Sequence, residues 1–199
     1  MNISFVGGGV MAEALIKGIL EARLAAPQDM RVGEPQESRR AHLKQKYGLE
    51  SYPGNLEAAN GADMVVLAVK PQSLKEVMSG LNKGLSKESA VASIVAGAKM
   101  ATLVQGLDHP AVIRIMPNTP AQIGAGMSVW TASPEVPEAK LEATRDILRT
   151  LGEEVYVADE KLIDMATALS ASGPAYVFLF IEALIDAGVY LGMPRDLAR

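Results

Sequence analysis

Residues 3–20 read ISFVGGGVMAEALIKGIL, an apolar run that breaks into three glycines and then takes on a helical pattern. Ile3–Val6 is predicted to be a strand and Val10–Glu21 a helix. Between them, Gly7–Ala12 fits the pattern G-x-G-x-x-G/A, whose first glycine permits a tight turn and whose second lets the backbone approach a pyrophosphate. The unpaired N–H groups at a helix N-terminus attract phosphate. The turn therefore predicts a dinucleotide site, with a simple packing turn as the alternative.

Short β-rich runs alternate with helical runs over the first two thirds of the chain. Strands are expected at Ile3–Val6, Met30–Gly33, Leu49–Tyr52, Asp63–Val69, Ala90–Val95 and Val112–Met116, and helices at Val10–Glu21, Gln36–Tyr47, Gln72–Leu81 and Met100–Leu107. Strands separated by helices predict an α/β fold with a doubly wound, mainly parallel sheet of the Rossmann type and right-handed crossovers.

The pattern changes after Met116. Gly126–Thr131 and Val155–Ala158 are predicted strands at the edge of the sheet, on either side of a long helix over Pro134–Leu151. From about Asp159 onward every segment has a helical pattern. We therefore expect a dinucleotide-binding domain at 1–158 and a helical domain at 159–199.

Composition excludes several classes of protein. A hydrophobic content of 49% indicates a folded protein, and the net charge of −4 argues against a nucleic-acid surface. The chain has no cysteine, so disulfides and thiolate metal sites are excluded, and no spacing of metal ligands is present. The N-terminus lacks the basic region of a signal peptide, and we expect a cytoplasmic protein.

The longest apolar run, Pro174–Met193, approaches the length of a membrane span. Glu182 and Asp186 lie in its middle, one helical turn apart, and two carboxylates at bilayer depth are costly. We therefore expect this run to form a helix buried in a bundle or in a subunit interface.

The end of the second strand carries conflicting signals about the dinucleotide. Glu34 stands where an acid accepts hydrogen bonds from the adenosine ribose and favours NAD. Arg39 and Arg40 follow within two helical turns and could reach a 2′-phosphate, or could form an ordinary solvated helix face. The residues alone leave the cofactor open.

Ligands of an open parallel sheet bind beyond the carboxyl ends of its strands. Lys70 follows the fourth strand and is suited to a phosphate or a ribose hydroxyl, with an ordinary surface lysine at a helix start as the alternative. Asn118 and Thr119 follow the sixth strand between two prolines that fix the loop, and could orient a nicotinamide or substrate or simply form a rigid turn. The two histidines, His42 and His109, lie at no such end and are interpreted as incidental. A protonated imine is already electrophilic, so this poor acid–base set favours C=N reduction, while Lys70 keeps C=O chemistry open.

Several motifs together resemble pyrroline-5-carboxylate reductases along the whole chain. They are FVGGGVMAEALIKG, ADMVVLAVKPQ, VASIVAGA, VIRIMPNTPAQIGAGMS and SASGPAYVFLFIEALIDAGV. The resemblance implies the last step of proline biosynthesis, the reduction of 1-pyrroline-5-carboxylate to L-proline, with NADPH as the expected cofactor and NADH as the alternative. Two other functions stay open: a hydroxyacid-type dehydrogenase that uses Lys70 as its acid, and a non-catalytic dinucleotide-binding module.

The resemblance also implies site residues. Cofactor contacts carry over to Val6, Gly7, Gly8, Gly9, Val10, Met11, Ala12, Asn55, Val69, Lys70, Pro71, Ala96, Gly97, Pro117 and Asn118, beside the candidates Glu34, Arg39 and Arg40. Substrate-side candidates are Asn118, Thr119, Ser172 and Gly173. No catalytic residue and no metal ligand is assigned.

The helical domain is implied to form a homodimer or a larger homo-oligomer. Ser172 is the expected N-cap of its long helix, with Pro174 in the first turn. Phe178, Phe180 and Leu184 are expected to be apolar surface that favours association. Family members are implied to continue beyond Arg199 with more helices and a loop for the substrate carboxylate, so we expect 159–199 to be only the N-terminal part of this domain.

Overall fold

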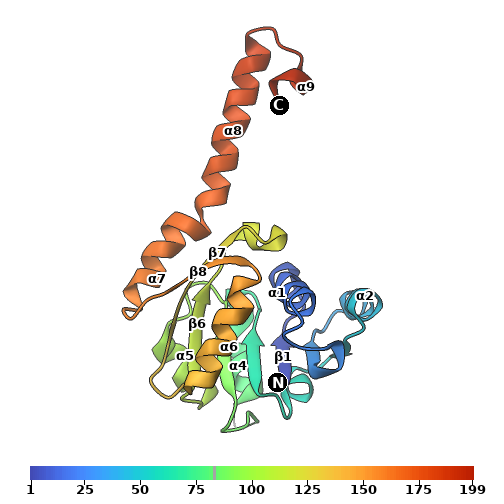
Figure 1. Ribbon diagram of the computed structural model, residues 1–199, viewed down its shortest axis with the longest axis vertical. Helices are drawn as coiled ribbons and strands as arrows, with labels where there is room; N and C mark the ends of the chain where they lie inside the picture. Colours follow the sequence, from blue (N-terminus) through green and yellow to red (C-terminus); the bar gives the residue numbers. More distant parts are fainter. Residues whose placement is uncertain (83) are drawn as a thin grey trace.

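An eight-stranded sheet forms the body of the computed structural model, which describes residues 1–82 and 84–199 (Figure 1). The strands are β1 (Ile3–Val6), β2 (Met30–Gly33), β3 (Glu50–Tyr52), β4 (Met64–Leu67), β5 (Ala90–Ser93), β6 (Val112–Met116), β7 (Gly126–Ala132) and β8 (Gly152–Tyr156). They lie in the order β3-β2-β1-β4-β5-β6-β7-β8, with β7 antiparallel to β6 and the other neighbours parallel. The predicted doubly wound sheet is confirmed, and its strand order reverses between β1 and β4.

Helices cover both faces of this sheet. They are α1 (Val10–Glu21), α2 (Glu37–Tyr47), α3 (Asn55–Ala59), α4 (Leu74–Leu81), α5 (Met100–Leu107) and α6 (Glu138–Arg149), with 3-10 turns η1 (Pro27–Asp29), η2 (Pro71–Ser73) and η3 (Thr119–Ile123). Met64 and Val66 of β4 pack in the cluster that holds α1, α2 and α6, whereas Val65 and Leu67 pack in the cluster that holds α3, α4 and α5. Alternate residues of a strand point to opposite faces, so a strand buried on both sides must be apolar throughout.

The C-terminal helices start against the sheet and then leave the body of the molecule. They are α7 (Lys161–Ala166), the π-helical turn η4 (Thr167–Ala171), α8 (Gly173–Tyr190) and α9 (Arg195–Ala198). Figure 1 shows α8 projecting away from the sheet. Its residues Phe178 and Phe180 are about two-thirds exposed. Of the described residues, Lys161–Tyr190 form one helix that is long and apolar enough to cross a membrane by length and composition alone.

The bounds of several elements differ from those predicted. The helix α6 begins at Glu138 instead of Pro134, because Pro137 at its N-cap has an extended backbone (ψ 146°). The strand β8 spans Gly152–Tyr156 instead of Val155–Ala158, because Gly152 (φ +133°) turns the chain directly from α6 against β7. The short helix α3 was not predicted, and β4 and β5 end earlier than predicted.

The prediction that Ser172 caps the long helix is wrong. Ser172 has helical dihedral angles (φ −83°, ψ −19°) and its hydroxyl donates to the carbonyl of Thr167 at 2.9 Å. The helix therefore continues from Lys161 through the π turn into α8. A residue inside a continuous helix has no free N–H group ahead of it to cap.

Candidate dinucleotide-binding site

The glycine turn is held where three strand ends meet. Gly7 has φ +95°, and its N–H donates to the Gly33 carbonyl at the end of β2 over 2.8 Å. A Cβ atom on Gly7 would lie 2.6 Å from the carbonyl oxygen of Ala68, which follows β4. Only glycine satisfies both the backbone angle and this close approach.

Gly9 leaves an open approach to the start of α1. Gly9 is exposed, and a Cβ placed on it would have no described atom within 4 Å. It is the N-cap of α1 and no side chain caps that helix, so the N–H groups of the first turn have no intrahelical partner. Free N–H groups beside an open glycine fit the pyrophosphate of a dinucleotide.

The carboxylate of Glu34 lies against the same turn. Glu34 follows β2 and is only 8% exposed. Its Oε2 accepts a hydrogen bond from the Gly8 N–H and its Oε1 one from the Gln36 N–H, both at 2.9 Å. The charged group is therefore fixed beside the glycine turn, where sequence reasoning placed the ribose-binding acid.

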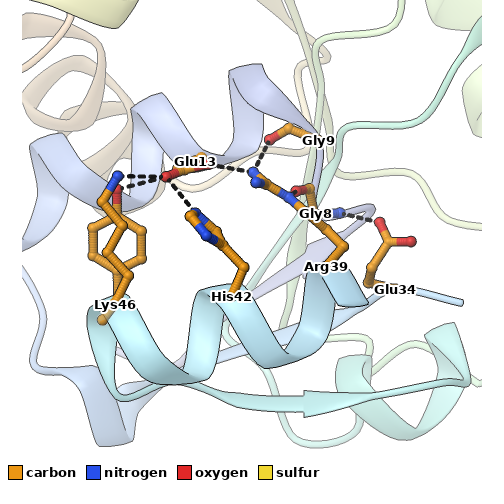
Figure 2. Close-up of polar contacts among 8 residues, drawn as sticks. Gly8, Gly9, Glu13, Glu34, Arg39, His42 and Lys46 are labelled. Carbon is orange, nitrogen blue, oxygen red and sulfur yellow. Dashed lines mark hydrogen bonds and ion pairs between the residues drawn. The ribbon is translucent and has the colours of Figure 1, made fainter. Parts of the chain in front are cut away.

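The two arginines after Glu34 contact the protein itself. The guanidinium of Arg39 donates to the carbonyls of Gly8 and Gly9 and pairs with Glu13 (Figure 2). Arg40 Nη1 donates to the carbonyls of Glu34 and Pro35, each at 2.8 Å. The structure thus brings both residues to the predicted site, with Arg39 against the backbone carbonyls of the turn.

Glu13 links the turn's helix to α2. Its Oε1 lies 2.9 Å from Lys46 Nζ, 2.9 Å from the Tyr47 hydroxyl and 3.1 Å from His42 Nε2. Partial burial pulls the pKa of Glu13 upward, but hydrogen bonds from Lys46, His42, Arg39 and Tyr47 outweigh it and hold the pKa below its usual range. His42, interpreted as incidental, belongs to this cluster, which fixes α1 against α2.

Asn55 lies above the end of β2. It is the first residue of α3, and a Cβ atom on Gly33 would lie 2.8 Å from its Oδ1 and 2.9 Å from its Cα. Gly33 therefore permits α3 to approach β2 closely enough for the half-buried Asn55 to border the site.

The ends of β4 and β5 form the next part of the same edge. Val69, Lys70 and Pro71 follow β4; Lys70 is exposed, and its side chain has no ion pair or hydrogen bond among residues 1–82 and 84–199. Ala96 and Gly97 follow β5, both exposed, with Gly97 at φ +76°. This edge is open at the places where sequence reasoning put the cofactor.

The loop after β6 is fastened to the C-terminal helices. The Asn118 side-chain amide donates to the Ser170 carbonyl at 3.1 Å, and its Oδ1 accepts the Met127 N–H at 2.9 Å. Thr119 is exposed, whereas the Ser172 hydroxyl bonds inside its own helix. Asn118 therefore holds the loop in shape by its side chain, beside the buried Pro117.

Sequence reasoning missed Arg114 and Glu13. Arg114 of β6 is buried and donates to Glu160 Oε1 and Asp164 Oδ1, each at 2.6 Å, which fastens α7 to the sheet. A lone arginine inside the apolar strand VIRIM was an available signal, because a buried charge requires a partner. Glu13 carried no signal, since an acid in the first turn of a helix is ordinary.

Comparisons with known proteins agree with this geometry. Residues 2–97 match the family model "NADP oxidoreductase coenzyme F420-dependent", and residues 160–199 match "Pyrroline-5-carboxylate reductase dimerisation". The pyrroline-5-carboxylate reductase of a Synechocystis strain is 42% identical over 199 residues, which are 100% of this chain and 74% of that protein. This chain belongs to the pyrroline-5-carboxylate reductase family.

Solved structures of the family superpose over the whole chain. The Coxiella burnetii pyrroline-5-carboxylate reductase has a TM-score of 0.88 at 33% identity and covers 99% of this chain and 73% of its own. The Plasmodium falciparum enzyme, described with NADP bound, has a TM-score of 0.87 at 31% identity and covers 100% of this chain and 72% of its own. The Rossmann-type body and the helical dimerisation segment are thus both features of the family.

Proposed function

We propose that this chain reduces the cyclic imine 1-pyrroline-5-carboxylate to L-proline, the last step of proline biosynthesis, with a nicotinamide dinucleotide bound along the edge described above. The observation that supports this most strongly is the open N-terminus of α1 behind Gly9, framed by the carboxyl ends of β1, β2 and β4. The identity of 42% to a named family member supplies the reaction. This makes the chain an NAD(P)H-dependent oxidoreductase acting on a C=N bond.

The backbone supplies most of the proposed cofactor contacts. Val6–Ala12 would hold the pyrophosphate, Glu34 and Asn55 the adenosine side, and Val69–Pro71, Ala96–Gly97 and Pro117–Asn118 the nicotinamide end. The bound nicotinamide supplies a hydride to the imine carbon. Protonation makes the imine electrophilic in advance, so the chain's own task is to orient the two reactants and to exclude water.

The helical segment is proposed as the place where two copies of the chain meet. We assign residues 1–158 to the dinucleotide-binding domain and 159–199 to the dimerisation domain, in a cytoplasmic homo-oligomer. Phe178, Phe180 and Leu184 expose apolar surface on α8, and residues 160–199 match the dimerisation family. Such an interface would account for the apolar surface of this helix. Thr119, Ser172 and Gly173, on the loop after β6 and at the π turn, are the proposed substrate side.

The Gly9→Ala substitution tests the site. Gly9 has φ −67° and open space around it, so alanine fits the free protein, yet the added methyl would occupy the approach to the first turn of α1. We expect NADH and NADPH to bind at least about tenfold more weakly, measured by calorimetry, with an unchanged urea midpoint. Gly80→Ala is the matched control, because Gly80 also has open space but lies in α4.

Two results would contradict this assignment. Unchanged affinity of Gly9→Ala for both cofactors would show that the first turn of α1 does not hold the dinucleotide. Cofactor oxidation with hydroxyacid ketones but none with 1-pyrroline-5-carboxylate, followed by nicotinamide absorbance, would assign the chain to a different reaction. Binding without any turnover would indicate a non-catalytic module.

A further inference from the structure

Charged side chains beside the end of β2 bear on which dinucleotide this site selects, an inference that rests on the proposed function. NADH and NADPH differ only at the adenosine ribose, which carries a 2′-hydroxyl in one and a 2′-phosphate in the other. A hydroxyl donates a hydrogen bond to a carboxylate, whereas a phosphate is repelled by it unless a cation stands between them. The charges beside the end of β2 therefore decide the selection.

The negative charge at this position is fixed. The Glu34 carboxylate is held by N–H groups of Gly8 and Gln36, both at 2.9 Å, and the residue is 8% exposed. These two hydrogen bonds and the burial of the residue keep the carboxylate against the glycine turn. An acid at the end of the second strand of a Rossmann fold is where the ribose hydroxyls of the dinucleotide bind.

The neighbouring positive charges are already engaged. Figure 2 shows Arg39 reaching from α2 to Glu13 and the glycine turn, where its guanidinium contacts two backbone carbonyls and one carboxylate. Arg40 Nη1 is bonded to two carbonyls at 2.8 Å. These contacts occupy Nε and Nη2 of Arg39 and Nη1 of Arg40. A 2′-phosphate would therefore compete with them or use the N–H donors that they leave.

We propose that Glu34 makes this site select NADH over NADPH, and that Arg39 and Arg40 stabilise the turn and the loop after β2 instead of binding a 2′-phosphate. Arg39 is then a positioning residue for either dinucleotide. Its guanidinium orders the carbonyls of Gly8 and Gly9.

Dissociation constants of NADH and NADPH, measured by calorimetry on the full chain without imine substrate, test the proposal. We expect the unsubstituted chain to bind NADH about tenfold more tightly or better. Glu34→Gln keeps an acceptor for Gly8 but removes the charge, so it should raise NADPH affinity and reduce the preference at least about fivefold. Glu37→Ser is the control, because Glu37 is an exposed acid three residues away and should leave the ratio unchanged.

Variants of Arg39 and Arg40 provide a second, independent test of the proposal. Arg39→Ala should weaken NADH and NADPH by the same factor, with partial recovery in Arg39→Lys, and Arg40→Ala should leave the ratio unchanged. NADPH binding as tight as or tighter than NADH, or a loss specific to NADPH in either alanine variant, would overturn the proposal and leave the proposed function intact. Binding of neither dinucleotide would overturn both. Glu34→Ser, with its fold checked by circular dichroism, replaces Glu34→Gln if that variant does not fold.

Discussion

Replacing Arg114 with methionine is expected to loosen the helical segment from the sheet. The Arg114 side chain is 3% exposed and bonds Glu160 and Asp164 at 2.6 Å each. Glu160 Oε1 also accepts the Met100 N–H at 2.6 Å, so one carboxylate joins β6, the start of α5 and the start of α7. These contacts fix the direction in which α7 and α8 leave the body.

The size of the effect follows from the exposure of each partner. A hydrogen bond to a charged group contributes about 1.5–3 kcal/mol, and Arg114 makes two of them. The side chains of Glu160 and Asp164 are 34% and 53% exposed, so water replaces part of what each carboxylate loses. We expect Arg114→Met to lower the free energy of unfolding by about 3 kcal/mol, Glu160→Gln by about 1.5 kcal/mol and Asp164→Asn by under about 1 kcal/mol.

Urea unfolding followed by circular dichroism, at one fixed protein concentration, measures this order. Arg149→Met is the matched control: the Arg149 side chain is 61% exposed and pairs with Asp146 and Glu154 at 3.9 and 3.6 Å, so its loss should cost under about 0.5 kcal/mol. Equal losses for Arg114→Met and Arg149→Met, or a larger loss for Asp164→Asn than for Glu160→Gln, would refute the reasoning.

Two further predictions concern α1 and α8. Hydrogen bonds hold the folded-state pKa of Glu13 below its usual range against the effect of burial, so its contribution is present above the unfolded pKa of about 4.3 and is lost as pH falls toward the folded value. Between about pH 6 and pH 3, the free energy of unfolding measured by urea titration should therefore fall by about 1 kcal/mol less for Glu13→Gln than for the unsubstituted chain. Parallel plots of this free energy against pH for the two proteins would contradict the prediction. Phe180→Lys should shift sedimentation toward the monomer, because Phe180 is 65% exposed on α8. Leu24→Lys is the control and should cause no shift, because Leu24 is 38% exposed on the body of the molecule. Unchanged sedimentation of Phe180→Lys would count against α8 as the interface.

The strands and the glycine turn could be predicted because their causes are local. A strand buried on both faces must be apolar at consecutive positions, and β4 (MVVL) has no other way to satisfy both clusters. Gly7 could be assigned because the pattern of glycines follows from a positive φ and a close approach, both confirmed here. The start of α6 could not be predicted with the same accuracy, because both Pro134 and Pro137 are suitable first residues of a helix by sequence.

The side chains of α2 show where local reasoning ends. Arg39 and Arg40 are adjacent in sequence and have the same charge, yet one lies under the glycine turn beside Glu13 and the other against the loop after β2. Which acceptor each guanidinium meets depends on how α2 packs on α1, and Leu43 is the one α2 residue buried in that contact. A single sequence does not determine that packing. Ser172 was misplaced for a similar reason, since a π turn that joins two helices leaves no mark in the residues that form it.

The same geometry changes what the glycine motif means for affinity. Its pattern fixes the backbone of Gly7 and leaves Gly9 open, but the carbonyls of Gly8 and Gly9 are oriented by Arg39 and the N–H of Gly8 by Glu34. Both of those residues lie outside the motif, after β2. Two chains with identical glycine turns can therefore differ in how tightly and how selectively they bind a dinucleotide, because α2 and the end of β2 set the turn's hydrogen bonds. If the proposal above holds, selectivity at this site is a property of residues 34–40, which the motif that identifies the fold does not include.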